Sequence, residues 1–139
     1  MDLQRLVDVE FRYSSMVFAG PSARAGRMFG TGDATFVGER LAGTATWANF
    51  PRVLQDGSTR PEAAGALTTV DGGTVLFRIR GNGYPQGGRA VHVLTFEVDD
   101  EAYSWLNDVV AVGDGSVDPE RGVLRMRYYE CVGSVDPGF

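Results

Sequence analysis

The chain has 139 residues, and 43% of them are hydrophobic, which predicts one globular domain over residues 1–139 with a sizeable core. Its 13 basic residues, all arginine, and its 18 acidic residues leave a net charge of -5, which argues against nucleic-acid and membrane partners because both need a basic face. The absence of lysine excludes Schiff-base chemistry, and the single histidine, His92, excludes a multi-histidine metal centre.

The N-terminal segment has the pattern of a half-buried strand from Leu6 to Tyr13. Apolar and charged side chains alternate along it with a period of two, as they do in a strand with one face in a core. The segment lacks the continuous apolar run of a signal peptide, and the chain has one cysteine. We therefore expect a cytoplasmic protein without internal disulfides.

Four glycines interrupt the segment from Met28 to Gly43. Glycine within a strand pattern is typical of bulges and tight bends, which a closing barrel needs. We therefore expect two short strands with tight corners in this segment.

A β-hairpin is predicted between residues 67 and 80. Thr74 to Arg80 alternates between two faces with a period of two, and Leu67 to Val70 is its expected partner strand. Asp71 and Gly72 lie between the two strands, and this pair favours a tight turn because both residues tolerate positive φ.

The C-terminal part contains two further predicted strands, Ala90 to Val98 and Val123 to Val132, which are rich in β-branched and aromatic residues. Between them, Tyr103 to Val112 is expected to be a helical turn running into a strand. The segment from Gly113 to Gly122 is expected to be a turn-rich loop.

About eight strands without a long amphipathic helix indicate an all-β fold. An antiparallel sheet of this size has to hide both of its edges, and a closed β-barrel does so at this chain length. A two-sheet sandwich is the alternative. The spacing of the glycines favours the barrel, because its strands have to curve.

Several short motifs occur in an order and spacing that resemble one known family. They are GDATFVGERLAG (32–43), LTTVDGGTVLFRIRG (67–81), FE (96–97), YSWLN (103–107), VG (112–113) and YE (129–130). Over nearly its whole length the chain resembles the bacterial and fungal domain-of-unknown-function family 3237. The resemblance implies a calycin-like or allene-oxide-cyclase-like barrel, often dimeric, whose members mostly have no assigned activity.

Position 49 is among those that depart from the pattern of that family. Where the family usually has Ala-Asp-Trp, this chain has Ala48, Asn49 and Phe50, so an amide replaces a carboxylate. The replacement argues against an acid–base role at position 49.

Glu130 is the candidate catalytic residue. It shares a strand face with Leu124, Met126 and Tyr128, so its carboxyl has apolar neighbours if that face points into the barrel. Apolar surroundings raise the pKa of a carboxyl and suit it to general acid–base catalysis. The alternative is that Glu130 pairs with an arginine near the barrel rim.

Tyr103, Trp105 and Asn107 are candidate ligand-binding residues in the segment expected to begin as a helical turn. If the segment is extended instead, Trp105 and Asn107 share one face and supply an aromatic wall and an amide that orients a bound carbonyl. Tyr128 and Glu130, on another late strand, would complete this pocket. The alternative is that Trp105 plugs one end of the barrel.

His92 and Glu97 complete the candidate ligand-binding residues. His92, flanked by valines, would carry protons if it faces the lumen, because it is the side chain that titrates near neutrality; the alternative is a structural role. The direction of Glu97 stays open, because both faces of its strand are apolar enough for burial. The acidic residues after Gly113 lack the spacing of a calcium loop, so no metal site is expected.

Two functions from different classes fit these residues. One is a cofactor-free isomerase, cyclase or lyase that orients a small, largely apolar substrate and uses one carboxylate, because these reactions need positioning and one proton transfer. The other is a lipocalin-like carrier without chemistry. Both predict a small-molecule ligand. A homodimer is also expected, from the family resemblance and because both faces of Ala90 to Val98 are apolar.

Overall fold

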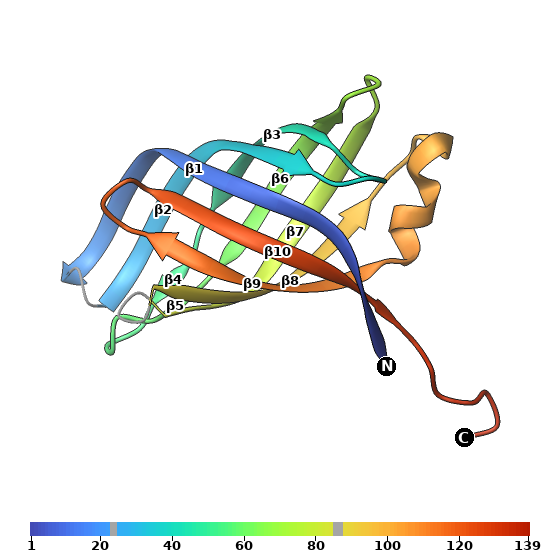
Figure 1. Cartoon of the computed structure of the whole chain (residues 1–139). Helices are drawn as coiled ribbons and strands as arrows, with labels where there is room; N and C mark the ends of the chain where they lie inside the picture. Colours follow the sequence, from blue (N-terminus) through green and yellow to red (C-terminus); the bar gives the residue numbers. More distant parts are fainter. Residues whose placement is uncertain (23–24, 85–87) are drawn as a thin grey trace.

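Strands that alternate apolar and polar side chains close into a β-barrel (Figure 1). The computed structural model describes residues 1–22, 25–84 and 88–139, and within them eight strands form an antiparallel ring. In ring order the strands are β1 (Asp2–Ser22), β10 (Val123–Val132), β9 (Val110–Asp118), β8 (Arg89–Glu97), β7 (Thr74–Tyr84), β6 (Glu62–Thr69), β3 (Gly43–Asn49) and β2 (Ala25–Val37). Pairing of β2 with β1 closes the ring, which confirms the predicted closed barrel over the sandwich.

The two ends of the barrel differ. At one end, the 3-10 helix η2 (Glu101–Asp108) follows β8, and its Leu106 is fully buried together with Leu41 from the loop after β2. At the other end, β1 and β2 continue as a hairpin beyond the last pair that β1 makes with β10, Arg12 with Val123 (Figure 1). The short strands β4 (Arg52–Val53) and β5 (Thr59–Arg60) join β2 to β7. No helix in the described part of the chain is long and apolar enough to cross a membrane.

Tyr128, Gly113 and His92 form one row across three neighbouring strands inside the barrel. Tyr128 on β10 pairs with Gly113 on β9, which pairs with His92 on β8. The Tyr128 ring lies over Gly113, where a Cβ atom would be 2.5 Å from the ring. The missing side chain lets the Tyr128 hydroxyl reach across β9 to Nδ1 of His92, at 2.9 Å.

Several sequence predictions are confirmed. The first strand covers the predicted Leu6 to Tyr13 and is longer at both ends. Residues 67 to 80 form the predicted hairpin, with Asp71 and Gly72 in its turn. The strand predicted at Ala90 to Val98 agrees with β8 to within one residue at each end, and Val123 to Val132 is β10.

Two glycine-based predictions are wrong. Met28 to Gly43 is not a pair of short strands, because β2 continues unbroken to Val37. Gly113 to Gly122 is a turn only over residues 119–122, because β9 extends to Asp118. The physical reason is the same in both strands: the glycines leave room for large side chains from other strands. A Cβ at Gly32 would be 2.6 Å from the Trp47 ring, as one at Gly113 would meet Tyr128.

The outer face of β8 exposes two valines. Val91 and Val93 are 51% and 39% exposed, and Val110 on the neighbouring β9 is 48% exposed. Homodimerisation stays a prediction. We expect sedimentation at micromolar concentration to show a dimer, because this face exposes apolar surface to water. A single species of 15.0 kDa would contradict it.

We predict that Gly113→Ala destabilises the protein by about 2 kcal/mol, because the added methyl group forces the Tyr128 ring off β9. Urea unfolding followed by circular dichroism measures the change. Gly133→Ala is the matched control, since a Cβ there would meet nothing within 4 Å. Equal stability of the two variants would contradict the proposed close packing at Gly113.

Candidate functional site

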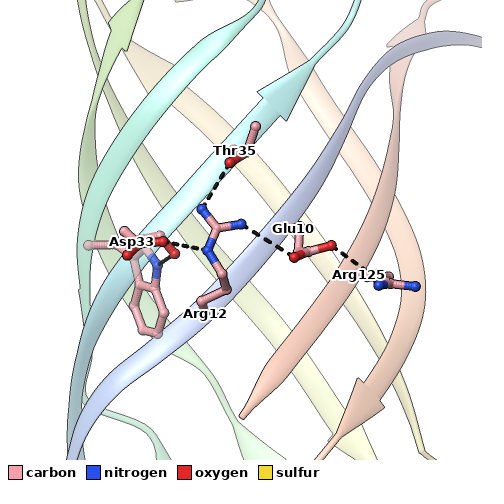
Figure 2. Close-up of polar contacts among 6 residues, drawn as sticks. Glu10, Arg12, Asp33, Thr35 and Arg125 are labelled. Carbon is pink, nitrogen blue, oxygen red and sulfur yellow. Dashed lines mark hydrogen bonds and ion pairs between the residues drawn. The ribbon is translucent and has the colours of Figure 1, made fainter. Parts of the chain in front are cut away.

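The outer wall of β2, β1 and β10 carries a network of charged side chains (Figure 2). Arg12 lies at its centre and donates to Asp33 at 2.6 Å, to Thr35 at 2.9 Å and to Glu10 at 3.4 Å. Glu10 also accepts from Arg125 at 3.1 Å. Exposed ion pairs of this kind each contribute about 0 to 1 kcal/mol. Because the charges alternate in sign and pair with one another, this wall offers no concentrated charge to a ligand.

A cavity of about 490 Å³ opens inside the barrel at the end where the β1–β2 hairpin projects. Most of its lining is aliphatic, aromatic or methionine side chains. These include Phe11, Met16, Phe18, Met28, Trp47, Ala63, Ile79, Ala90 and Leu124. A cavity with this lining favours a largely apolar ligand.

Tyr13, Asn49 and Glu62 form a hydrogen-bonded chain at the cavity wall. Tyr13 on β1 and Asn49 on β3 both line the cavity. Asn49 donates from Nδ2 to the Tyr13 hydroxyl at 2.9 Å and accepts at Oδ1 from the backbone N–H of Glu62 at 3.0 Å. The β3–β6 ladder ends at the pair of Asn49 with Ala63. Beyond this pair, the Asn49 side chain accepts the hydrogen bond of the Glu62 N–H in place of a backbone carbonyl. Burial raises the pKa of Tyr13, which keeps the phenol protonated.

His92 lines the same cavity from β8, and Tyr128 lies behind it. Burial lowers the pKa of His92 to about 4, so the imidazole is neutral at pH 7. Burial also raises the pKa of Tyr128, whose side chain is completely inaccessible. The lining therefore presents a neutral phenol and a neutral imidazole on β1 and β8, which are separated by β10 and β9 in the ring.

Among the described residues that line the cavity, one side chain is charged. It belongs to Asp118, at the end of β9. Its carboxylate accepts from the backbone N–H of Arg121 at 3.2 Å, in the turn before β10. Among residues 1–22, 25–84 and 88–139, no group of three or more histidine, cysteine, aspartate or glutamate side chains is arranged to hold a metal ion. The polar chemistry that the described lining offers is therefore mainly hydrogen bonding.

Glu130 and Trp105 both contact Arg40 at the opposite end of the barrel. Arg40, from the loop after β2, binds the Glu130 carboxylate at 2.7 Å and lies 4.5 Å over the Trp105 ring. Trp105, on η2, packs against the core of the barrel. For both residues the structure therefore agrees with the alternative given in the sequence analysis. Glu130 pairs with an arginine, and Trp105 packs at one end of the barrel. Neither residue lines the cavity.

The pocket expected from Trp105, Asn107, Tyr128 and Glu130 is not assembled. Residues 103 to 107 belong to the helix η2, so Trp105 and Asn107 do not alternate along a strand. Asn107 is exposed and hydrogen-bonds both backbone groups of Val98. It therefore holds the end of η2 against Val98, the residue that follows β8, and does not line the cavity.

Tyr103 and Glu97 also point away from the cavity. The Tyr103 hydroxyl donates to Asp71 at 2.8 Å and ties η2 to the β6–β7 turn. Glu97 lies exposed on the outer face of β8. Of the residues expected to bind a ligand, His92 lines the cavity and Tyr128 supports it from behind.

Tyr13 and Asn49 are cavity residues that the sequence analysis did not single out as site residues. The alternation in Leu6 to Tyr13 already placed Tyr13 on the apolar face. Asn49 stands where the family usually has aspartate, and this replacement is the sequence feature that distinguishes it. Neither signal shows which polar groups meet, because Tyr13 and Asn49 lie 36 positions apart in the chain.

Comparison with solved structures shows the same fold elsewhere. A β-barrel-like protein from Acinetobacter baumannii is 22% identical, with a TM-score of 0.80 over 93% of this chain and 94% of that chain. A protein of unknown function from Clostridium acetobutylicum is 16% identical, with a TM-score of 0.80 over 95% and 100% of the two chains. An enzyme from Penicillium herquei is 21% identical, with a TM-score of 0.70 over 93% and 92%.

Comparison by sequence is more restricted. No curated protein has a similar sequence. Residues 83–131 match the model of a family described as protein of unknown function (DUF3237). This match confirms, over β8, η2, β9 and most of β10, the family resemblance seen in the sequence motifs.

Proposed function

We propose that the protein binds a small, largely apolar organic molecule in the barrel cavity and acts on it as a cofactor-free isomerase, cyclase or lyase. The observation that carries the proposal is the cavity itself, which is about 490 Å³ in volume, open at one end and lined by apolar side chains with a few polar groups among them. That the similar barrel from Penicillium herquei is an enzyme supports the catalytic part.

The residues of this chain would act by positioning and by hydrogen bonding. The apolar walls hold the substrate in one orientation and exclude water. Tyr13 and His92 are both neutral at pH 7, and each could donate to a substrate oxygen on which negative charge develops during the reaction. Donors held in place in an apolar cavity stabilise such charge more strongly than water does.

A carrier without chemistry is the second candidate function. One observation favours it. Among the described residues of the lining, a single side chain is charged, that of Asp118 at the end of β9. A lipocalin-like carrier needs an apolar cavity but no acid or base. Incubation with a bound compound distinguishes the two functions, because a carrier returns the compound unchanged and an enzyme converts it.

We predict that Ala63→Phe weakens binding of the neutral fluorescent probe N-phenyl-1-naphthylamine by at least about 10-fold. Ala63 lines the cavity, so the phenyl ring would occupy the space of the ligand. Fluorescence titration measures the affinity, and circular dichroism checks the fold.

Ala64→Phe is the matched control for this experiment. Ala64 is the next residue on β6 and is exposed on the outer face, so the same substitution there leaves the cavity unchanged. We expect wild-type affinity for the probe. Equal affinities of the two variants would show that the probe does not bind in the cavity.

We also predict that His92 makes the stability of the protein depend on pH. The pKa of His92 is about 4 in the folded protein and near 6.5 in the unfolded chain, so the unfolded chain takes up a proton as the pH falls through 6.5. The stability linked to the neutral imidazole is complete above pH 6.5 and is lost as the pH falls towards 4.

The test compares urea unfolding of the wild type and of His92→Gln at pH 7 and at pH 5. Between these values the wild type should lose about 2 kcal/mol more unfolding free energy than the variant, whose glutamine does not titrate. Equal losses in the two proteins would mean that the imidazole of His92 is not held neutral by burial.

A further inference from the structure

The backbone N–H of Glu62 fixes the orientation of the Asn49 amide. That N–H can donate only to an oxygen, so Oδ1 of Asn49 faces Glu62, at 3.0 Å. The NH2 group must then face Tyr13, and it donates to the Tyr13 hydroxyl at 2.9 Å. This orientation follows from the protein's own donors and does not depend on how the amide atoms are assigned.

Asn49 therefore decides what the Tyr13 hydroxyl can offer to a ligand. The hydroxyl oxygen accepts from Asn49, and an amide NH2 group has no lone pair with which to accept the hydroxyl proton in return. Among the described residues, Asn49 is the hydrogen-bond partner of the Tyr13 hydroxyl. Tyr13 lines the cavity, so its proton is left for a group inside it.

The same reasoning applies to His92. The Tyr128 hydroxyl is completely buried, and within the described residues its hydrogen-bond partner is Nδ1 of His92, at 2.9 Å. A buried hydroxyl proton without an acceptor is costly, so Tyr128 donates and Nδ1 accepts. The neutral imidazole then carries its proton on Nε2, the nitrogen left for the cavity that His92 lines.

Resting on the proposed binding function, we propose that Asn49 sets the hydrogen-bond polarity of the cavity, and that its ligand is an uncharged, largely apolar molecule with a carbonyl oxygen that accepts from the Tyr13 hydroxyl. A carbonyl matches this donor because its oxygen accepts hydrogen bonds and carries no proton of its own, and His92 is a second donor elsewhere in the lining. A carboxylate fits less well, because the described lining contains no arginine and includes the carboxylate of Asp118.

Two neutral fluorescent probes test the proposal. Prodan is a naphthyl ketone whose emission shifts to the red when its carbonyl accepts a hydrogen bond. N-phenyl-1-naphthylamine has a similar apolar frame and no carbonyl. The wild-type protein should bind both, with the emission of bound prodan red-shifted relative to its emission in an aprotic solvent. Absence of the red shift would contradict a donor in the cavity.

Asn49→Asp is the decisive variant. Its carboxylate can accept both from the Glu62 N–H and from the Tyr13 hydroxyl, so it turns the Tyr13 proton away from the cavity. We expect prodan affinity to fall about 5-fold or more and the emission of bound prodan to shift to the blue. Affinity for N-phenyl-1-naphthylamine should change less than about 2-fold.

Two further variants keep the test interpretable if Asn49→Asp folds poorly. Tyr13→Phe removes the hydroxyl proton without adding charge. It should likewise weaken the binding of prodan and shift the emission of bound prodan to the blue. Asn107→Asp is the matched control for added charge, because Asn107 lies on η2 at the opposite end of the barrel from the cavity. It should leave both probes at wild-type affinity and wild-type emission.

The outcomes separate this proposal from the proposed function. If the wild type binds neither probe, the proposed binding function fails. If both probes bind but Asn49→Asp and Tyr13→Phe weaken them equally, or leave the emission of prodan unchanged, the cavity binds apolar molecules and the carbonyl proposal is wrong. A selective loss of prodan with a blue shift supports it.

Discussion

The hydrogen bond from Tyr128 to His92 across Gly113 is the contact on which the arrangement of the interior depends. An eight-stranded barrel has an interior barely wider than its own side chains. A tyrosine can lie across such an interior only where the neighbouring strand has no side chain, as at Gly113. Tyr128 fills the space behind His92, and the open space begins on the other side of the imidazole.

This row divides the barrel into two parts with different contents. On the side of η2, Leu41 and Leu106 are buried, and Arg40 pairs with Glu130 and lies over the Trp105 ring. On the side of the β1–β2 hairpin, the same pattern of inward apolar residues leaves a cavity. Charged pairs lie at the rim and on the outer wall, where water reduces their cost, and neutral polar groups lie inside.

The polar groups inside are ordered by hydrogen bonds to backbone and side-chain partners. The Glu62 N–H orients Asn49, and Asn49 orients the Tyr13 hydroxyl. Tyr128 does the same for His92. A binding site with its donors held in place by such partners does not have to reorganise when a ligand arrives, which lowers the cost of binding and of stabilising developing charge.

The sequence by itself determined β8, β10, the central part of β1, the β6–β7 hairpin and the closed barrel. Period-two alternation and turn chemistry are properties of the local sequence, so they can be recognised without knowing which residues pack against it. Only the tertiary structure decided what the glycines and the polar side chains do. Gly113 was expected to begin a loop, but it lies in a strand beneath Tyr128, a residue 15 positions later. Glu130 shares its strand face with Tyr128, yet the Arg40 side chain at the rim binds it. These outcomes depend on which side chains of other strands lie nearby, and the register of strand pairing in the closed ring sets those contacts.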